Sequence, residues 1–252
     1  MTKQQSRVGE NAPMIIAMWS GPRNLSTALM RSFAQRADAA AWDEPFYAAY
    51  LKTTGLPHPM AGEVIAAGIS DPAEVARACL EVPEGKQVFY QKHMTHHMLD
   101  GYPLDWIDTV TNAFLLRSPE HVLASYVKKH EDVGAADIGF AMQRELFDRA
   151  ADRLGTAPPV IDSTDIRRDP QKALSALCAA LEIPFDPAML SWKPGPAPED
   201  GVWGVHWYDA IWKSTGFAPP EGDPPPLPDR LARIADEVRA DHLHLASHKI
   251  AL

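Results

Sequence analysis

The stretch that most constrains the fold is residues 14–33, MIIAMWSGPRNLSTALMRSF. Its first six residues form a continuous apolar run, which suits a strand buried on both faces of a parallel sheet. Gly21 and Pro22 interrupt that run, and from Leu25 onward apolar residues recur at helical spacing. A strand, a tight loop and a helix in this order can bind phosphate, because the first amides of a helix lack intrahelical partners and carry partial positive charge.

The loop in this stretch carries side chains that suit an anion. Arg23 supplies a planar cation, and Asn24, Ser26 and Thr27 add short donors on either side of Leu25. The loop lacks the second glycine and the lysine of a Walker A motif, GxxxxGK(S/T). The alternative is an ordinary strand-to-helix turn with Asn24 or Ser26 as its N-cap.

Short apolar runs alternate with helical patterns along the rest of the chain. We expect further strands at residues 39–42, 86–92, 113–116 and 159–161, with helices between them. This alternation predicts an α/β fold in which helices cover both faces of a mostly parallel sheet. The 252 residues are enough for one large domain, and we expect residues 1–252 to form a single one.

The composition narrows the possible partners. A formal net charge of −9 argues against sequence-independent binding to nucleic acid or to an anionic membrane. No stretch approaches the roughly 18 consecutive apolar residues of a transmembrane helix. Cys79 and Cys178 form no CxxC motif and suit free thiols in a reducing compartment. We therefore expect a cytoplasmic protein that begins with a flexible arm at residues 1–13.

The last part of the chain has a different character. Four of the seven tryptophans and many of the 23 prolines lie beyond Pro184. We predict that residues 184–228 form a long, ordered, aromatic- and proline-rich loop region that packs on the sheet through its aromatic side chains. Residues 229–245 are predicted to close the chain as one helix.

A second turn that suits an anion follows the strand at residues 113–116. Arg117 ends that strand, and Ser125 lies about two turns into the helix that Ser118 and Pro119 begin. Two such turns on one parallel sheet suggest a ligand with two separated anionic groups. In the alternative, Arg117 pairs with a structural carboxylate and Ser125 packs at an interface.

At these two turns the chain resembles the sulfotransferases. The string PRNLSTALM at residues 22–30 resembles their loop for a 5′-phosphosulfate, P(K/R)SGTT, and departs from it at Asn24 and Leu25. The string LLRSPEHVLASY at residues 115–126 resembles their motif for a 3′-phosphate. The resemblance implies the P-loop-type fold of this family and the donor 3′-phosphoadenosine 5′-phosphosulfate. The residues that would bind the donor are Arg23, Asn24, Leu25, Ser26 and Thr27 at the 5′ end, and Arg117 and Ser125 at the 3′-phosphate.

The resemblance also implies a reaction. A sulfuryl group would pass in line to a hydroxyl or amine of a small-molecule acceptor, with a general base and without a metal ion. Arg23 would stabilise the leaving phosphate. Two alternatives stay open: a P-loop kinase or nucleoside triphosphatase that uses ATP and Mg²⁺, and a nucleotide-binding protein without catalysis.

Two residues compete for the role of general base. His93 follows the strand at residues 86–92, where cytosolic sulfotransferases carry a Lys-Thr-His string with the histidine as base. Here Lys92 directly precedes His93, so His96 and His97 are further candidates. Glu44 follows the second strand, where some bacterial carbohydrate sulfotransferases keep a catalytic glutamate, and it would need a pKa raised by burial.

Other polar and aromatic residues give weaker indications. His93 and His97 are spaced like a metal pair on a helix, but no third ligand accompanies them, and we predict no metal site. Lys193 and Lys213 are candidates for reaching the 3′-phosphate from the tail. Trp203, Trp207 and Tyr208 either line an acceptor pocket or serve as hydrophobic anchors.

Overall fold

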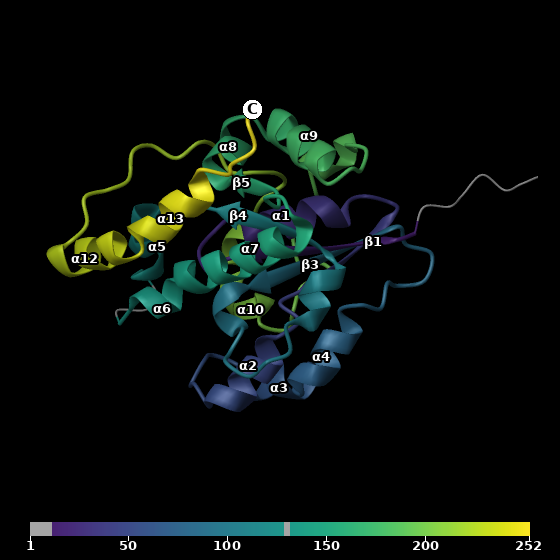
Figure 1. The fold of residues 1–252 in the computed structure, drawn as a ribbon, viewed down its shortest axis with the longest axis horizontal. Coiled ribbons are helices and arrows are strands. Elements are labelled where there is room, and N and C mark those ends of the chain that lie inside the picture. The colour runs from purple at the N-terminus through teal and green to yellow at the C-terminus, as the bar shows by residue number, and fades with distance from the viewer. Residues whose placement is uncertain (1–11, 129–131) are drawn as a thin grey trace, which may run out of the picture.

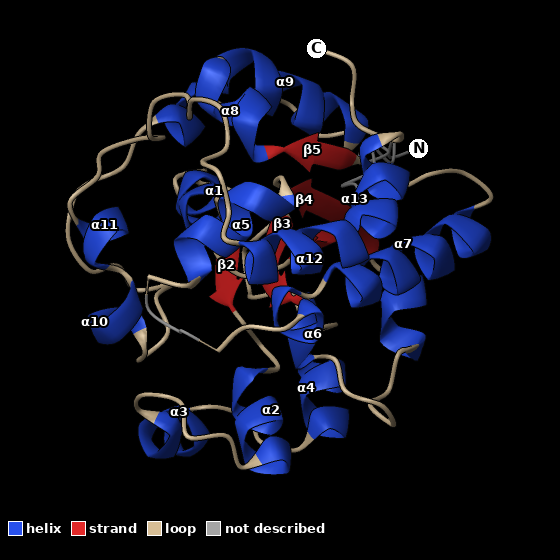
Figure 2. Cartoon of the chain, turned by 90° about the vertical axis from the view of Figure 1, so that its left-hand side faces the viewer, coloured by secondary structure: helices blue, strands red, loops and turns tan. Residues whose placement is uncertain are grey.

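The structure, a computed structural model, describes residues 12–128 and 132–252. Within them lies a sheet of parallel strands, which are β1 (Met14–Ser20), β2 (Ala39–Asp43), β3 (Val88–Met94), β4 (Thr111–Leu116) and β5 (Val160–Asp162). Their order is β2-β3-β1-β4-β5, and helices lie on both faces of the sheet (Figure 1, Figure 2). The predicted α/β class with a mostly parallel sheet is confirmed.

The strand order places a switch point at β1. The chain passes from β1 outward to β2, returns to β3, and then crosses to the other side of β1 for β4 and β5. In open α/β sheets, ligands bind beyond the carboxyl ends of the strands at such a point. The loop that follows β1 and carries Arg23 begins there.

Alternating residues of β1 face two separate cores, as the two-residue period of a strand requires. Ile16 and Met18 pack in one buried cluster, and Ala17 and Trp19 pack in another. The first cluster includes residues of α1 (Ser26–Ala34), α9 (Pro170–Ala180) and the 3-10 helix η3 (Pro187–Leu190). The second includes residues of α4 (Pro72–Ala78), α5 (Pro119–Tyr126), α7 (Phe140–Leu154), α12 (Asp229–Glu237) and α13 (Arg239–Ala246).

A third apolar cluster attaches residues 184–228, called the C-terminal segment below, to the helices that follow β2. Trp203 and Tyr208 are buried there against residues of α2 (Tyr47–Thr54) and α3 (Ala61–Ala67). The segment itself forms the short helices α10 (Gly204–Trp207) and α11 (Asp209–Trp212), which lie along one side of the molecule in Figure 2. The remaining elements are η1 (Thr95–His97), η2 (Asp105–Thr109), α6 (Ala135–Ile138) and α8 (Ser163–Arg168).

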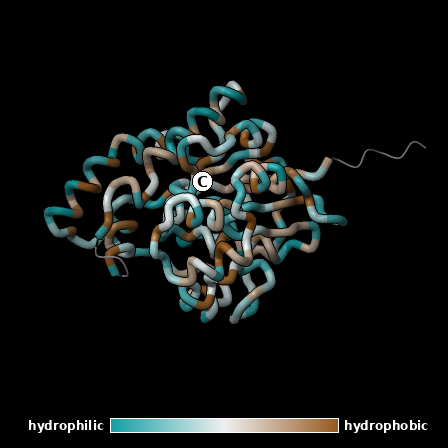
Figure 3. Tube along the Cα trace, turned by 90° about the horizontal axis from the view of Figure 1, so that it is seen from below, coloured by the Kyte–Doolittle hydropathy of each residue, from teal (hydrophilic) through white to brown (hydrophobic). Residues whose placement is uncertain are grey.

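Polar side chains that directly precede a proline cap the starts of α4 and α5. Asp71 accepts from the amides of Ala73 and Glu74 at the start of α4, and Ser118 accepts from the amide of His121 at the start of α5. In contrast, the single closing helix predicted at residues 229–245 is two helices, because the backbone of Val238 leaves helical geometry at φ −91° and ψ 0°. α12 is amphipathic, because its buried residues Leu231, Ile234 and Ala235 recur at helical spacing, and brown and teal sections alternate along it at the far left of Figure 3.

Several predictions about the whole chain stand apart from these elements. The flexible arm at residues 1–13 lies mostly outside the described residues, which begin at residue 12. That residues 1–252 form one domain stays a prediction. None of the helices in the described ranges is long and apolar enough to cross a membrane.

Candidate active site

A cavity of about 720 Å³ lies at the carboxyl ends of the strands, at the switch point of the sheet. Residues at or just beyond the ends of β1, β2, β3 and β4 line it, Arg167 of α8 follows β5, and the C-terminal segment covers one side. The lining residues that bear on chemistry are Arg23, Asn24, Ser26, Thr27, Glu44, Tyr47, His58, Lys92, His96, His97, Arg117, Ser125, Arg167, Trp203, Trp207, Tyr208 and Glu221.

The loop after β1 is held in a tight and strained shape. A Cβ atom on Gly21 would lie 2.4 Å from the carbonyl oxygen of Ile138, so only glycine fits there. Arg23 adopts a left-handed backbone with φ 55°. Such strain in a residue other than glycine costs on the order of 1 kcal/mol or more and gathers at functional sites.

The N-terminus of α1 opens into the cavity. The N-cap residue is Leu25, and no described side chain caps the helix. The alternative predicted from the sequence, a turn capped by Asn24 or Ser26, is therefore not found. Because Ser26 and Thr27 line the cavity, the first-turn amides of α1 are placed to receive an anion.

The side chain of Asn24 joins the loop to a neighbouring strand. Its side-chain oxygen accepts from the amide of Leu25 at 2.8 Å, and its nitrogen donates to the carbonyl of Leu115 at 3.0 Å. Asn24 thus ties the loop to β4 while lining the cavity. Leu25 is buried in the core on the α1 face of the sheet, so its backbone is the part that bears on the loop.

The structure brings the two predicted anion-binding turns together. The guanidinium of Arg23 donates through Nε to the hydroxyl of Ser125 at 3.1 Å, and Arg117 donates to the carbonyl oxygen of Arg23. Burial lowers the pKa of Arg23, and the neighbouring charge of Arg117 lowers it further. Two guanidinium groups crowd this end of the cavity, which favours an anionic ligand there.

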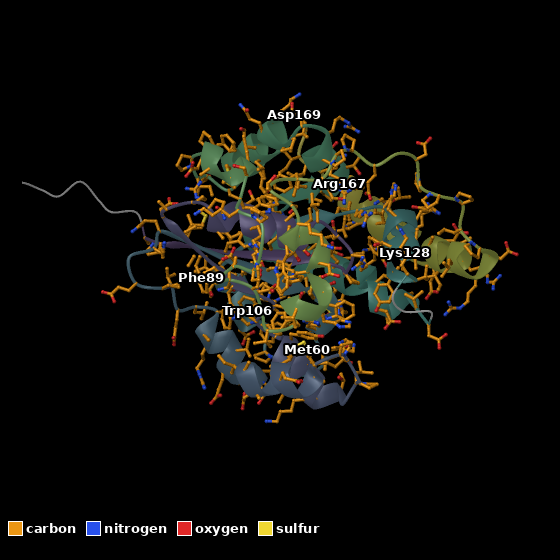
Figure 4. All side chains as sticks on the ribbon, turned by 180° about the vertical axis from the view of Figure 1, so that it is seen from behind. Met60, Phe89, Trp106, Lys128, Arg167 and Asp169 are labelled. Carbon is orange, nitrogen blue, oxygen red and sulfur yellow. The ribbon has the colours of Figure 1, made fainter. Side chains whose placement is uncertain are left out.

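Arg117 also pairs with a carboxylate, as the structural alternative expected. Glu221, from the C-terminal segment, accepts from both Nε and Nη2 of Arg117, the Nε contact being 3.1 Å. Arg167, which follows β5, lies 3.3 Å from the same carboxylate. Sequence reasoning missed Arg167, because nothing in its neighbourhood places it beside Arg117. Figure 4 labels Arg167 and Lys128, both of which line the cavity.

A buried lysine and two carboxylates form the other end of the cavity. Lys92 donates to Asp43 at 2.8 Å and to Glu44 at 2.6 Å. The pairing of β2 with β3 places Asp43 directly opposite Lys92. Burial acts to lower the pKa of Lys92, but the two carboxylates outweigh it and hold that pKa well above its usual value. Lys92 therefore stays charged.

Glu44 has the environment that a carboxylate base requires. Burial raises its pKa, Lys92 opposes the rise, and Asp43 adds to it. Its backbone is left-handed with φ 42°, the strained geometry already noted for Arg23. A raised pKa makes a carboxylate a stronger base at neutral pH.

The C-terminal segment is locked onto this charged cluster through Tyr208. Its hydroxyl accepts from Lys92 at 2.9 Å and from the indole of Trp203 at 3.1 Å, and donates to Asp43 at 2.6 Å. The amide of Gly201 donates to the same carboxylate at 3.1 Å. Trp203 and Tyr208 thus act as buried anchors while they line the cavity. The signal in the sequence was a lysine within a strand, between Gln91 and His93.

The histidines divide between the cavity and the core. His96 and His97 line the cavity, and His97 Nδ1 lies 4.0 Å from the second carboxylate oxygen of Glu44. His93 is not among the lining residues. It stacks on Trp19 with ring centroids 4.5 Å apart and bonds to Gln91, and burial lowers its pKa to about 3. Neighbouring residues of a strand face opposite sides, so Lys92 takes the cavity side and His93 the core.

Two further features of the described residues concern lysines and possible metal ligands. Lys193 and Lys213 are not among the described residues that line the cavity. No group of three or more histidine, cysteine, aspartate or glutamate side chains within the described residues could hold a metal ion.

A family model described as a sulfotransferase domain matches residues 14–246. The chain belongs to the sulfotransferase domain family. The predicted family is thereby confirmed. Two Arabidopsis thaliana proteins, named branched-chain-amino-acid aminotransferase-like proteins 1 and 2, are each 38% identical to it, over 216 and 214 residues. These matches cover 86% and 85% of the chain but only 39% and 38% of the relatives, so the chain spans about two fifths of their length.

Solved structures of sulfotransferases share the fold. A sulfotransferase from Alicyclobacillus acidocaldarius is 14% identical with a TM-score of 0.54, and the match covers 94% of this chain and 97% of that one. The sulfotransferase domain from the Synechococcus PCC 7002 olefin synthase is 16% identical with a TM-score of 0.50 and is covered to 98%, as is this chain. At these identities the likeness concerns the fold.

Proposed function

We propose that this chain transfers a sulfuryl group from 3′-phosphoadenosine 5′-phosphosulfate to a hydroxyl or amine of a small-molecule acceptor. One observation carries the proposal: a single cavity joins a cationic end, with Arg23 and Arg117, to a buried carboxylate of raised pKa, Glu44. Membership of the sulfotransferase domain family supports the class of reaction.

The cationic end suits the two anionic groups of the donor. In this proposal the α1 amides, Arg23, Ser26 and Thr27 receive the 5′-phosphosulfate, while Arg117 and Ser125 receive the 3′-phosphate. The fit has support in the structure, because Arg117 already holds the two oxygens of the Glu221 carboxylate. A guanidinium that binds a carboxylate in this way has the geometry to bind a phosphate.

The carboxylate end suits proton removal from the acceptor. Lys92 holds one oxygen of Glu44, so the other oxygen, 4.0 Å from His97 Nδ1, is left to face an acceptor. No described residue hydrogen-bonds to that nitrogen. Burial and the nearby histidines hold the pKa of His97 well below its usual value, so the imidazole is neutral. In this proposal, a neutral His97 and Glu44 both contact the acceptor hydroxyl.

The step balances with these residues alone. The acceptor oxygen forms a bond to sulfur as the bond from sulfur to the phosphate oxygen breaks, and Glu44 takes the proton of the acceptor. Arg23 stabilises the charge that develops on the leaving phosphate. We assign the base to Glu44 and not to His93, because His93 is packed in the core and the cavity is lined by Glu44.

Incubation with the donor and a panel of alcohols, phenols and amines tests the proposal. We expect acceptor-dependent release of adenosine 3′,5′-bisphosphate and a sulfated product of matching mass. A parallel incubation with ATP and Mg²⁺ tests the kinase alternative, and phosphorylated product there with no sulfated product would overturn the proposal. Donor binding without transfer to any acceptor would favour the non-catalytic alternative.

A further inference from the structure

The carboxylate of Glu221 lies where the proposed function places the 3′-phosphate. It contacts Arg117 through two of the guanidinium nitrogens, and Arg167 Nη1 lies 3.3 Å from Oε1. The side chain of Arg117 is 8% exposed and that of Arg167 is 15% exposed. Two largely buried guanidinium groups on one acidic side chain make a built anion site, and Glu221 occupies it.

Arg167 is incompletely satisfied by this carboxylate. Its Nε is buried and makes no hydrogen bond with any described residue. Burial lowers the pKa of Arg167, and Arg117 lowers it further while Glu221 opposes both. A phosphate carries more charge than a carboxylate and offers one more oxygen. It would therefore neutralise the two arginines more fully and provide an acceptor for the orphaned Nε.

The segment that carries Glu221, residues 218–227, makes few hydrogen bonds to the rest of the described structure. No backbone–backbone hydrogen bond joins residues 218–227 to other described residues. Besides the contacts of Glu221 with Arg117 and Arg167, this segment has a hydrogen bond between the carbonyl oxygen of Gly222 and His121 Nε2, at 3.1 Å. Displacing Glu221 thus breaks few contacts, and the incoming phosphate replaces the ion pairs that are lost.

We propose that Arg167 is a third ligand of the donor's 3′-phosphate, and that Glu221 is a built-in competitor which holds this subsite closed until the nucleotide displaces it. The proposal rests on the proposed function, since it names a further binding residue of the same site. The observed affinity for a 3′-phosphate nucleotide then equals the intrinsic affinity reduced by the fraction of molecules whose subsite is open.

Calorimetric titration with adenosine 3′,5′-bisphosphate and with AMP tests whether Glu221 competes with the 3′-phosphate. Glu221→Gln keeps the shape and removes the charge, and we expect it to bind the bisphosphate roughly fivefold or more tightly than the unmodified protein. AMP lacks the 3′-phosphate, so its affinity should stay within about twofold. Asp223→Asn is the matched control, because it removes a charge two residues away that also lines the cavity. It should leave the bisphosphate affinity within about twofold.

A second set of variants tests whether Arg167 binds the 3′-phosphate. Arg167→Gln should weaken bisphosphate binding by roughly tenfold or more and leave AMP unchanged, with partial recovery in Arg167→Lys. The double variant Arg167→Gln with Glu221→Gln should still bind the bisphosphate less well than Glu221→Gln alone.

The outcomes separate this inference from the function on which it rests. If the unmodified protein binds the bisphosphate but Glu221→Gln binds it equally or less well, the competitor is refuted while the proposed function stands. Equal gains for AMP and bisphosphate would also refute it, since the effect would then not concern the 3′-phosphate. If neither protein binds the bisphosphate, both proposals fall. Binding by Glu221→Gln alone would support both.

Discussion

Glu44 illustrates how much of this chain's chemistry depends on the surroundings of a single residue. Its carboxylate lies between a permanent cation, Lys92, and a neutral imidazole, His97. The backbone strain at Glu44 stabilises nothing by itself, so the packing of β2 against β3 must hold it in place. In the proposed reaction, Glu44 is thus positioned at a cost in stability.

Replacing Glu44 tests its role as the base. We expect Glu44→Gln to lower kcat by roughly 10²-fold or more with little change in donor affinity, because shape is kept and proton acceptance is lost. The acidic limb of the kcat profile should lie above pH 4.5, the usual value for a glutamate, because burial raises this pKa and the base works only when deprotonated. That limb should vanish in the variant.

His93→Ala is the matched comparison for that experiment. It should reduce the free energy of unfolding by about 2–4 kcal/mol through the cavity it leaves beside Trp19, while the folded protein keeps its kcat within a few-fold. A collapse of kcat in His93→Ala with full activity in Glu44→Gln would reverse the assignment.

The sequence identifies some of these residues and not others. Arg117 and Ser125 follow from their spacing after a strand, because Arg117 ends the strand and Ser125 lies about two turns into the helix that Ser118 caps. The sequence alone could not decide whether Glu44 or His93 lies in the cavity. The side of the sheet on which His93 lies depends on the exact position of its strand, which the sequence pattern does not define. The partnership of Lys92 with Asp43 needs the register between two strands that are far apart in sequence.

Among the elements, α1 and the C-terminal segment are joined by a buried ion pair. Arg31 on α1 donates to both oxygens of Asp200 at 3.1 and 2.6 Å, and Trp212 donates to the same carboxylate at 2.8 Å. The side chains of Arg31 and Asp200 are 2% and 6% exposed. Since the same segment carries Trp203 and Tyr208, this pair helps to position one wall of the cavity.

Breaking the pair should loosen that wall. We expect Asp200→Asn to lower the free energy of unfolding by about 2 kcal/mol, because the buried charge of Arg31 loses its hydrogen-bonded counter-ion and keeps only Glu199, whose Oε1 lies 3.6 Å from Arg31 Nε. Denaturant titration measures the loss, and Asp209→Asn on the exposed side of α11 should change it by less than about 0.5 kcal/mol. Equal effects of the two substitutions would show that the Arg31–Asp200 ion pair makes no specific contribution to the free energy of unfolding.

Elements were predictable where local signals decide them. The strands and the caps of α4 and α5 follow from apolar runs and from Asp-Pro and Ser-Pro pairs. The break between α12 and α13 has no such signal, because residues 229–245 keep a helical pattern throughout and no glycine or proline lies near Val238, where the helix ends. The short helices of the C-terminal segment likewise depend on tertiary contacts.

For the molecule as a whole, the buried histidines make stability depend on pH. Burial lowers the pKa of His93 to about 3, and burial with His58 lowers that of His96 to about 4, against a usual 6.5. The pKa of His97 is also held well below 6.5, chiefly by burial. In the window between pH 6.5 and these values the unfolded chain binds more protons than the folded one, so stability falls as the pH falls. Glu44 opposes this trend, because its pKa is raised.

Calorimetry at several pH values checks this dependence. We expect Tm to fall by several degrees from about pH 7.5 to about pH 5, since three such histidines cost at most about 4 kcal/mol per pH unit. His93→Gln should flatten the slope by up to about a third. A Tm that rises on acidification would mean that the carboxyl groups, and not the histidines, dominate the proton balance.

The central claim concerns which nucleotide the cavity recognises, and one calorimetric comparison tests it most directly. Adenosine 3′,5′-bisphosphate, AMP and ATP with Mg²⁺ are titrated into the unmodified protein and into Arg117→Ala. We predict that the bisphosphate binds most tightly and that Arg117→Ala weakens it by on the order of 2 kcal/mol or more, as for loss of a charged hydrogen-bond partner, while AMP hardly changes. Tightest binding of ATP with Mg²⁺, or equal weakening of the bisphosphate and AMP, would contradict it.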